Sequence, residues 1–185
     1  MRVITGTARG RKLTAPEGLE VRPTADMVKE AMFTIVAFDV PGARVLDLFA
    51  GSGQLGIEAL SRGASHAVFI DHNPESIQHI KANLNATGLF SNASVANMDS
   101  LSYLRRCQDR FDLAFLDPPY GKQLIDEALP MVAGVMGENG LILCETGRDE
   151  AVPETAGDFV VKKHYRYGKK KVTVYHRAKA GEDES

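Results

Sequence analysis

A short motif, Asp117-Pro118-Pro119-Tyr120, follows the apolar run 111–116 and has the residue types needed to hold a planar amine. Proline fixes the backbone angle φ and has no N–H, so the Pro118 carbonyl is held rigidly and can accept a hydrogen bond. The Asp117 carboxylate and that carbonyl could each accept one proton of an exocyclic amine, while the Tyr120 ring could stack on a base. An ordinary strand-ending turn with a surface tyrosine is the alternative interpretation.

This arrangement would activate an aryl amine, whose lone pair is otherwise delocalised into the ring. Accepting both N–H bonds returns electron density to the nitrogen and aims it at a methyl carbon. A sulfonium is already a good leaving group, so the reaction needs no metal. Asp117 could also accept the released proton in a secondary role, because that proton becomes acidic only after methylation. The five histidines have no metal-ligand spacing, and we predict no metal site.

A second motif places glycines at positions 51, 53 and 56 in a G-x-G-x-x-G pattern after an apolar strand segment. Glycine permits a tight turn and lets a ligand approach the backbone at the start of a helix. Asp71 ends the next strand segment, where a carboxylate could accept hydrogen bonds from both hydroxyls of an adenosine ribose. Together these features indicate an adenosine-containing cofactor. For Gly56 we expect only close helix-to-strand packing.

The acid just before this loop separates two cofactors that both contain adenosine. Asp47 would repel the pyrophosphate of NAD, whereas it suits the ammonium and sulfonium groups of S-adenosylmethionine. Asp47 could instead only cap a turn or contact the loop amides. Further along the chain, Asp99 could accept a hydrogen bond from the adenine amine with Met98 on the ring, or it could be a helix N-cap.

The elements that must position these residues alternate between short apolar strands and amphipathic helices. We predict strands at 44–49, 67–71, 93–97, 111–117 and 140–145, and helices at 54–62, 74–86, 100–107 and 123–136. This alternation predicts an α/β fold with a parallel sheet and helices on both faces. Residues 158–166 and 171–176 predict a terminal antiparallel hairpin.

Before this alternation the pattern predicts one more helix, from Thr24 or Ala25 to about Phe38, with Thr24 as a candidate N-cap. Its apolar face is formed by Met27, Ala31, Met32, Ile35 and Val36. The preceding segment has Gly6 and Gly10 between short residues, which suits a small β-hairpin or an extended arm.

The length and composition of the chain limit the classes of protein to which it can belong. The chain has 185 residues, 44% hydrophobic and 25% charged, which fits one globular domain and excludes disordered and fibrous classes. Two cysteines do not make a disulfide framework. With no signal-peptide pattern and no apolar run long enough to span a membrane, we expect a soluble cytoplasmic protein.

Because the net charge is −2, attraction to nucleic acid must come from local clusters of cations. The first cluster lies at the N-terminus and consists of Arg2, Arg9, Arg11, Lys12 and Arg22. Each residue alone suits a solvated charged loop, whereas for the cluster as a whole we predict RNA phosphate contacts, because residues 1–14 contain no acid and a family resemblance extends into them. The second lies between residues 162 and 171, and could be a further RNA surface or an exposed hairpin edge protected by lysine. Since the target base must leave its stack, we expect it in an RNA loop or bulge.

Four stretches of the chain resemble one family: RVITGTARGRKL, RPTADMVKEAMF, LDLFAGSGQLGIEALSRGA and FLDPPY. They are similar to the RsmD family of class I, Rossmann-like, S-adenosylmethionine-dependent methyltransferases, which methylates guanine N2 in 16S ribosomal RNA. The resemblance covers nearly the whole chain and is most specific from Val45 to Ala64. It implies a mostly parallel seven-stranded sheet with an antiparallel last strand, S-adenosylmethionine as cosubstrate, and 16S rRNA or an assembling small subunit as partner. Gln54 departs from the small residue expected there, and Asp71 replaces a glutamate.

These observations give a definite set of predictions. We expect a monomer with a basic N-terminal arm or hairpin (1–23), a Rossmann-like domain (24–178) and a frayed tail (179–185). The predicted catalytic residues are Asp117, Pro118 and Tyr120. The predicted cofactor-binding residues are Asp47, Phe49, Gly51, Ser52, Gly53, Asp71, Met98 and Asp99.

Two other functions use the same motifs. An adenine amine methyltransferase acting on DNA would have the same Asp-Pro-Pro-Tyr tetrad. A non-catalytic, NAD-binding Rossmann module would have the same type of glycine loop.

Overall fold

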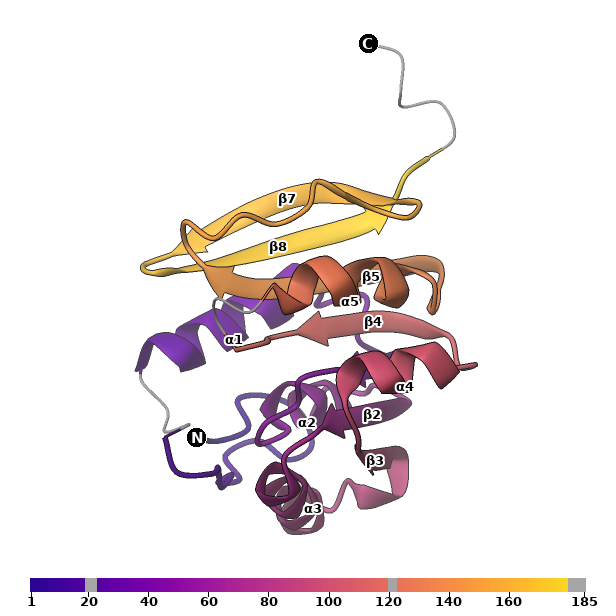
Figure 1. The fold of residues 1–185 in the computed structure, drawn as a ribbon. Coiled ribbons are helices and arrows are strands. Elements are labelled where there is room, and N and C mark those ends of the chain that lie inside the picture. Colours follow the sequence, from indigo (N-terminus) through magenta and orange to yellow (C-terminus); the bar gives the residue numbers. More distant parts are fainter. Residues whose placement is uncertain (19–22, 120–122, 180–185) are drawn as a thin grey trace.

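In the computed structural model, which describes residues 1–18, 23–119 and 123–179, a mixed sheet runs through the centre of the protein (Figure 1). The strand order is β3-β2-β1-β4-β5-β8-β7-β6. Five strands are parallel: β1 (Arg44–Asp47), β2 (His66–Asp71), β3 (Ala93–Asn97), β4 (Phe111–Leu116) and β5 (Met136–Gly147). The remaining pairings are antiparallel and involve β6 (Thr155–Ala156), β7 (Phe159–Tyr167) and β8 (Lys170–Arg177).

This architecture confirms the Rossmann-like fold predicted from the sequence. All seven predicted strands are present, and the last one, β8, is antiparallel to β5 and lies between β5 and β7. The eighth strand, β6, has only two residues. The predicted terminal hairpin is formed by β7 and β8.

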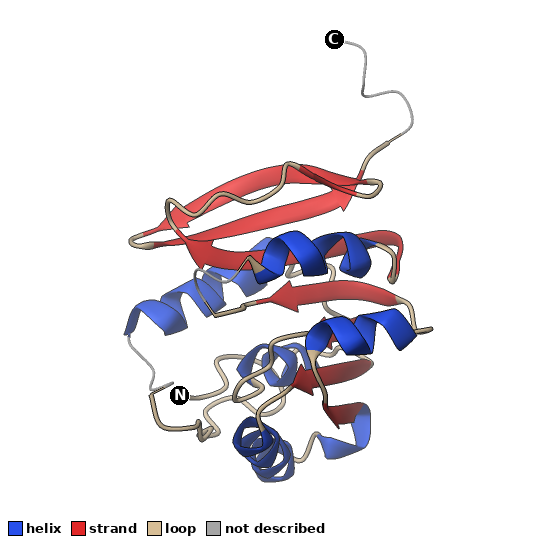
Figure 2. Ribbon diagram, in the orientation of Figure 1, coloured by secondary structure: helices blue, strands red, loops and turns tan. Residues whose placement is uncertain are grey.

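Helices cover both faces of the sheet, which explains why its central strands are apolar on both sides (Figure 2). α1 (Pro23–Ile35), α2 (Gln54–Ser61) and α3 (Pro74–Thr87) share one core cluster, and α4 (Ser100–Arg106) and α5 (Leu124–Ala133) share the other. A 3₁₀ turn, η1 (Phe90–Asn92), precedes β3. No helix within 1–18, 23–119 and 123–179 is long and apolar enough to cross a membrane.

The first helix differs from the prediction at both ends. α1 begins at Pro23, so Thr24 lies inside the helix and the N-cap prediction was wrong. Proline is well placed there, because the first helical N–H needs no partner within the helix. The helix stops at Ile35, and the following turn leaves Phe38 fully exposed at 100%.

The buried face of α1 also differs. Met32 and Val36 are buried as expected, but Met27 is 51% exposed, and Phe33 lies in the core. Lys29 is only 2% exposed, and its buried Nζ donates a hydrogen bond to the Arg2 carbonyl at 2.8 Å. The N-terminal segment covers this side of the helix, so the buried stripe is rotated from the one that apolar periodicity predicts.

The predicted boundary between α5 and β5 lies later in the sequence than the observed one. The helix ends at Ala133, and β5 starts at Met136, four residues before the predicted strand. Pairing of Met136 with Phe111 extends the sheet into a stretch that contains Gly137 and Gly140 and therefore has little strand propensity of its own.

Residues 2–13 form a small hairpin, with a bridge between Arg2 and Lys12 and a hydrogen bond from Gly10 N to the Val3 carbonyl. We call this segment the N-terminal hairpin. Its buried side chains Val3 and Leu13 join the core cluster of α1–α3. The hairpin is therefore packed on the sheet-covering helices, while residues 180–185 of the predicted frayed tail lie outside the described residues.

Candidate active site

The strand order reverses between β1 and β4, and open α/β sheets bind their ligands at such a point, beyond the carboxyl ends of the strands. Asp47 is the last residue of β1, and Asp117 directly follows β4. The two strands are paired, with Asp47 in register with Phe115. The fold thus brings the two motifs found in the sequence to one edge of the sheet, which we call the carboxyl edge.

Three carboxylates lie on neighbouring strands at this edge. Along each strand, side chains alternate between the two core clusters, and this alternation places Asp47, Asp117 and Glu145 on the face covered by α1–α3. Asp117 follows Leu116, which pairs with Cys144, so it lies beside Glu145.

Burial and charge repulsion both act on the first of these acids. Asp47 is 2% exposed. The pKa of Asp47 is raised to about 8, mainly by burial and also by the negative charges of Asp117 and Asp71, while a hydrogen bond from the Gly56 N–H acts in the opposite direction. A buried acid whose pKa is raised in this way is a candidate functional group at the carboxyl edge of an α/β sheet.

Asp117 is perturbed in the same direction. Burial and the neighbouring Glu145 raise the pKa of Asp117 to about 7, while Lys170 lowers it. Lys170 also forms an ion pair with Glu145. Sequence reasoning missed Glu145 and Lys170 as parts of the site, although an acid at the end of a predicted strand on the same edge was a usable signal for Glu145.

The glycine loop turns sharply between β1 and α2. Gly51 and Gly53 have φ angles of 58° and 79°, in the left-handed region that favours glycine. Asp71 supports the turn: its carboxylate accepts hydrogen bonds from Gly51 N at 2.8 Å and from Asn73 N at 2.9 Å. A second lone pair on each oxygen leaves capacity for further donors.

Gly56 has the packing role predicted for it. A Cβ atom at this position would lie 2.3 Å from Cε1 of Phe69, a fully buried residue of β2. The Gly56 N–H donates to Asp47 Oδ2 at 2.9 Å. Asp47 therefore does contact a loop amide, as its alternative interpretation supposed, and its other oxygen has no such contact within the described residues.

Ser52 connects the loop to the N-terminal hairpin. Its hydroxyl donates to the Met1 sulfur at 3.1 Å. The Asn83 side chain, on α3, donates to the Ser52 carbonyl at 2.9 Å and to the Thr14 carbonyl at 2.8 Å, and accepts from Thr14 N at 2.8 Å. No sequence signal pointed to Asn83, because its role depends on two distant segments meeting at one helix.

The remaining predicted cofactor residues lie around the same edge. Asp99 is exposed and is the N-cap of α4, accepting from Ser102 N at 3.0 Å, which lowers the pKa of its carboxyl group. Met98 is half-buried, and its N–H donates to the Asp71 carbonyl at 3.0 Å. Phe49 is half-buried and packs on the core cluster of α4 and α5.

At the tip of β4, Asp117 is half-buried, Pro118 is buried and Pro119 is exposed. Tyr120 and Arg22, two of the predicted site residues, lie outside the described residues. The other predicted RNA-binding residues all lie on the N-terminal hairpin with exposed side chains: Arg2, Arg9, Arg11 and Lys12.

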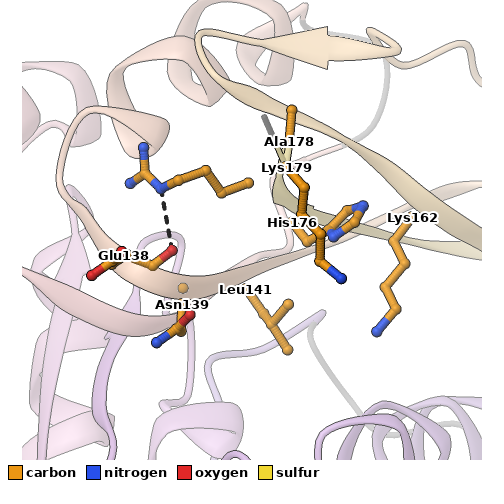
Figure 3. Close-up of a pocket in the computed structure, with 9 residues that line it drawn as sticks. Glu138, Asn139, Leu141, Lys162, His176, Ala178 and Lys179 are labelled. Atoms are coloured by element: carbon orange, nitrogen blue, oxygen red, sulfur yellow. Dashed lines mark hydrogen bonds between the residues drawn. The ribbon is translucent and has the colours of Figure 1, made fainter. Parts of the chain in front are cut away.

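A cleft of about 440 Å³ lies at the opposite end of the sheet, which we call the amino edge (Figure 3). It is lined by the start of β5 and by parts of β7 and β8, including Glu138, Lys162 and His176. None of the predicted catalytic or cofactor-binding residues lines it. The two acids with raised pKa values, Asp47 and Asp117, lie at the carboxyl edge and not in this cleft.

The chain is similar to known proteins over most of its length. The family model described as "Conserved hypothetical protein 95" matches residues 1–176. A Bacillus subtilis (strain 168) protein named "Putative rRNA methyltransferase YlbH" is 41% identical over 182 residues, covering 96% of this chain and 99% of that protein. "Ribosomal RNA small subunit methyltransferase D" of Escherichia coli (strain K12) is 33% identical over 187 residues, covering 100% of this chain and 94% of that protein.

A solved structure has the same fold over almost the whole chain. It is described as "Putative methyltransferase yhhF from Escherichia coli", with a TM-score of 0.83, 33% identity and coverage of 97% of this chain and 99% of that one. The family match and these similarities confirm the resemblance seen in the sequence: the chain belongs to the family described as Conserved hypothetical protein 95, the RsmD family.

Proposed function

We propose that this protein transfers a methyl group from S-adenosylmethionine to an exocyclic base amine of ribosomal RNA. More narrowly, we propose guanine N2 in 16S rRNA as the acceptor, either in free RNA or in an assembling small subunit. The observation that carries the proposal is the meeting of the glycine loop, with the buried Asp47, and the Asp117 turn at one switch point of the sheet.

The residues around the glycine loop fit S-adenosylmethionine. The raised pKa of Asp47 shows that its charged form lacks compensation, which a ligand ammonium group would supply. Gln54 Oε1, at the start of α2, is buried without a hydrogen-bond partner within the described residues. An unpaired buried acceptor costs about 1–3 kcal/mol, which a donor on the ligand would recover. When bound, S-adenosylmethionine supplies an electrophilic methyl group on a sulfonium.

The protein groups near Asp117 fit the acceptor amine. Asp117 is a stronger acceptor for an N–H bond when it is ionised, and Lys170 favours that form while Glu145 opposes it. Together with the Pro118 carbonyl, the carboxylate would orient the amine nitrogen and restore its lone pair. Tyr120 is proposed as the stacking surface for the base. Asp71 is proposed for the ribose hydroxyls, and Met98 and Asp99 for the adenine.

The choice of RNA rests on the relatives and on charge. Relatives at 33–41% identity are named as rRNA methyltransferases, and the guanine N2 assignment rests on the family resemblance. The exposed cations of the N-terminal hairpin lie on the segment that is tied to the glycine loop through Asn83. Contacts from these cations, and from Arg22, would set affinity and register while the site selects the base.

Transfer of tritiated methyl groups tests the proposal. The purified protein is incubated with labelled S-adenosylmethionine and with 16S rRNA, protein-depleted 30S particles or DNA, followed by nucleoside analysis. We expect N2-methylguanosine from the rRNA or the particles. Methyladenine in DNA would assign the adenine alternative. Titration with S-adenosylhomocysteine and NADH completes the test, because binding of NADH alone would reject a methyltransferase.

A further inference from the structure

The basic segment near the C-terminus lies at the carboxyl edge of the sheet. The β7–β8 turn, Tyr167 to Lys170, is in register with the last residues of β5: Lys170 pairs with Gly147, and Lys171 with Thr146. Gly147 lies only two residues beyond Glu145, the neighbour of Asp117. The turn and the proposed acceptor site therefore lie at the same edge, as Figure 1 shows for β4, β7 and β8.

Three exposed cations surround this turn, and we call them the tip cations: Arg148, Arg166 and Lys169. Arg148 is fixed to the turn, because its N–H donates to the Lys169 carbonyl at 2.8 Å and its Nη1 to the Gly168 carbonyl at 3.1 Å. Within the described residues none of the three forms an ion pair, whereas Lys170 pairs with Glu145. The tip cations thus present positive charge that the protein itself does not neutralise.

The composition of the β7–β8 hairpin favours a nucleic acid over an acidic protein as the partner. From Phe159 to Lys171 the chain contains no acid. Two half-buried tyrosines, Tyr165 and Tyr167, lie on the face that also carries Glu145, and Lys163 lies 5.0 Å over the Tyr165 ring. Arg166, between the two tyrosines in the sequence, projects from the opposite face of the strand. Cations interleaved with aromatic rings are typical of surfaces that follow an RNA strand.

We propose that Arg148, Arg166 and Lys169 bind phosphates of the RNA strand beside the target nucleotide. This inference rests on the proposed function and extends it. The N-terminal hairpin lies on the other side of the glycine loop, so the tip cations would provide a second, separate set of backbone contacts. They would hold the strand against the acceptor site without selecting its sequence.

The opposing explanation is that these cations only protect a sheet edge. β6 pairs with β7 at Phe159 and Val160, and the Val161 N–H donates to the Glu154 carbonyl at 3.0 Å; beyond Val161 the outer edge of the strand is unpaired within the described residues. Charges on such an edge prevent pairing with other chains. Edge protection predicts aggregation when the cations are removed, and it predicts no change in RNA affinity.

The test uses the full chain with Arg148→Gln, Arg166→Gln and Lys169→Gln combined. The control removes three exposed cations elsewhere: Lys81→Gln, Arg106→Gln and Arg110→Gln. Dissociation constants are measured for protein-free 16S rRNA and for protein-depleted 30S particles between 50 and 200 mM salt. The salt slope is the change in the logarithm of the binding constant with the logarithm of the salt concentration, and each single-strand phosphate contact contributes about 0.7 unit to it. For the tip variant we expect the slope to fall by about 2 and KM for RNA to rise about tenfold or more. Its kcat at saturating RNA and its affinity for S-adenosylhomocysteine should stay unchanged.

Several outcomes would overturn the proposal. An RNA affinity and salt slope equal to those of the control variant would assign the cations to edge protection, and aggregation of the tip variant with normal RNA binding would do the same. A loss seen with particles but absent with protein-free RNA would indicate a ribosomal protein instead. If the unsubstituted protein methylates RNA while the tip variant keeps its KM, only this inference fails. If the unsubstituted protein transfers no methyl group, the proposed function fails.

Discussion

The two ends of the sheet use their charged groups in opposite ways. At the amino edge, Arg177 donates to the carbonyls of Glu138, Met136 and Gly137, pairs with Asp158 and lies 4.9 Å over the Phe159 ring. At the carboxyl edge, burial and neighbouring acids raise the pKa values of Asp47 and Asp117. Charge at one end holds the start of β5 in place, whereas at the other end two acids keep raised pKa values beside the Lys170–Glu145 ion pair.

This contrast shows why concavity alone is a poor guide to this site. The cleft at the amino edge (Figure 3) is lined in part by Arg177, whose guanidinium group is already bound to other groups of the protein. The carboxyl edge contains acids that would be stabilised by a bound cation and by amine donors. The following changes should separate the two ends, from the largest effect to the smallest.

Replacing Asp117 by Ala should have the largest effect on activity. Loss of the carboxylate removes one of the two acceptors for the amine, and we expect kcat for methyl transfer to fall about 10³-fold, as for other preorganised polar groups. Affinity for S-adenosylhomocysteine, measured by calorimetry, should change little. The control is Glu138→Gln in the amino-edge cleft, which should retain full activity. Full activity of the Asp117→Ala protein would reject the amine-holding role.

Gly6→Ala should have the largest effect on stability, because a Cβ there would lie 1.8 Å from the backbone oxygen of Ser61. The N-terminal hairpin would have to move off α2, and we expect a loss of about 3 kcal/mol. Gly10→Ala is the matched control: its φ is also positive, at 81°, but nothing lies within 4 Å, so about 1–2 kcal/mol is expected from backbone strain alone. Urea denaturation measures both. Equal losses would show that the hairpin adapts freely.

Gly56→Ala should affect fold and ligand binding together. The added methyl group meets the ring of Phe69 and shifts the amide that donates to Asp47, so we expect about 1–3 kcal/mol of destabilisation and weaker S-adenosylhomocysteine binding. Adding Phe69→Leu should recover part of the binding loss, since it makes room for the methyl group. Losses that simply add in the double variant would contradict this packing explanation.

The smallest expected effect is on pH dependence. In the folded, ligand-free protein the pKa of Asp47 is raised to about 8, above the unfolded value near 4, so the folded state binds the extra proton between these values. Stability from this group is therefore complete below about pH 4 and is lost as pH rises toward 8. Thermal melts of the ligand-free protein should show Tm falling over this range, and Asp47→Asn should flatten the dependence.

The same titration predicts the reverse trend for the ligand. Because the ionised form of Asp47 is the one that attracts an ammonium group, affinity for S-adenosylhomocysteine should increase between about pH 6 and 8. Calorimetry at several pH values checks this. An affinity of the native protein that is independent of pH would argue against contact between Asp47 and the ligand amine.

Motifs with local chemistry were predictable from the sequence, and contacts between distant segments were not. The positions of the glycine loop, Asp47 and Asp117 at the carboxyl edge were predictable because they depend on neighbouring residues and on strand ends. Glu58 is different: it is fully buried and accepts from Ile4 N at 2.9 Å and Thr5 N at 3.0 Å, contacts that exist only once the hairpin packs on α2.

The burial of Lys29 could not be predicted for the same reason. Desolvation lowers the pKa of Lys29, partly offset by Glu58, 3.8 Å away. A lysine on a predicted helix normally faces solvent, and here the covering segment comes from the start of the chain. Met27, an apolar residue predicted to be buried, is exposed on the same helix. Helical periodicity predicts that a helix has a buried face, but the segments packed on the helix determine which residues form that face.

The packing of the N-terminal hairpin also determines the order in which a growing chain can fold. Thr14 binds Asn83, which is 69 residues later, and Ile4 binds Glu58, 54 residues later. The hairpin is synthesised before both partners, and synthesis adds only about 5–20 residues per second. This basic segment must therefore wait several seconds for α2 and α3, so the part of this sequence made first cannot reach its native position until residues 54–87 have been made.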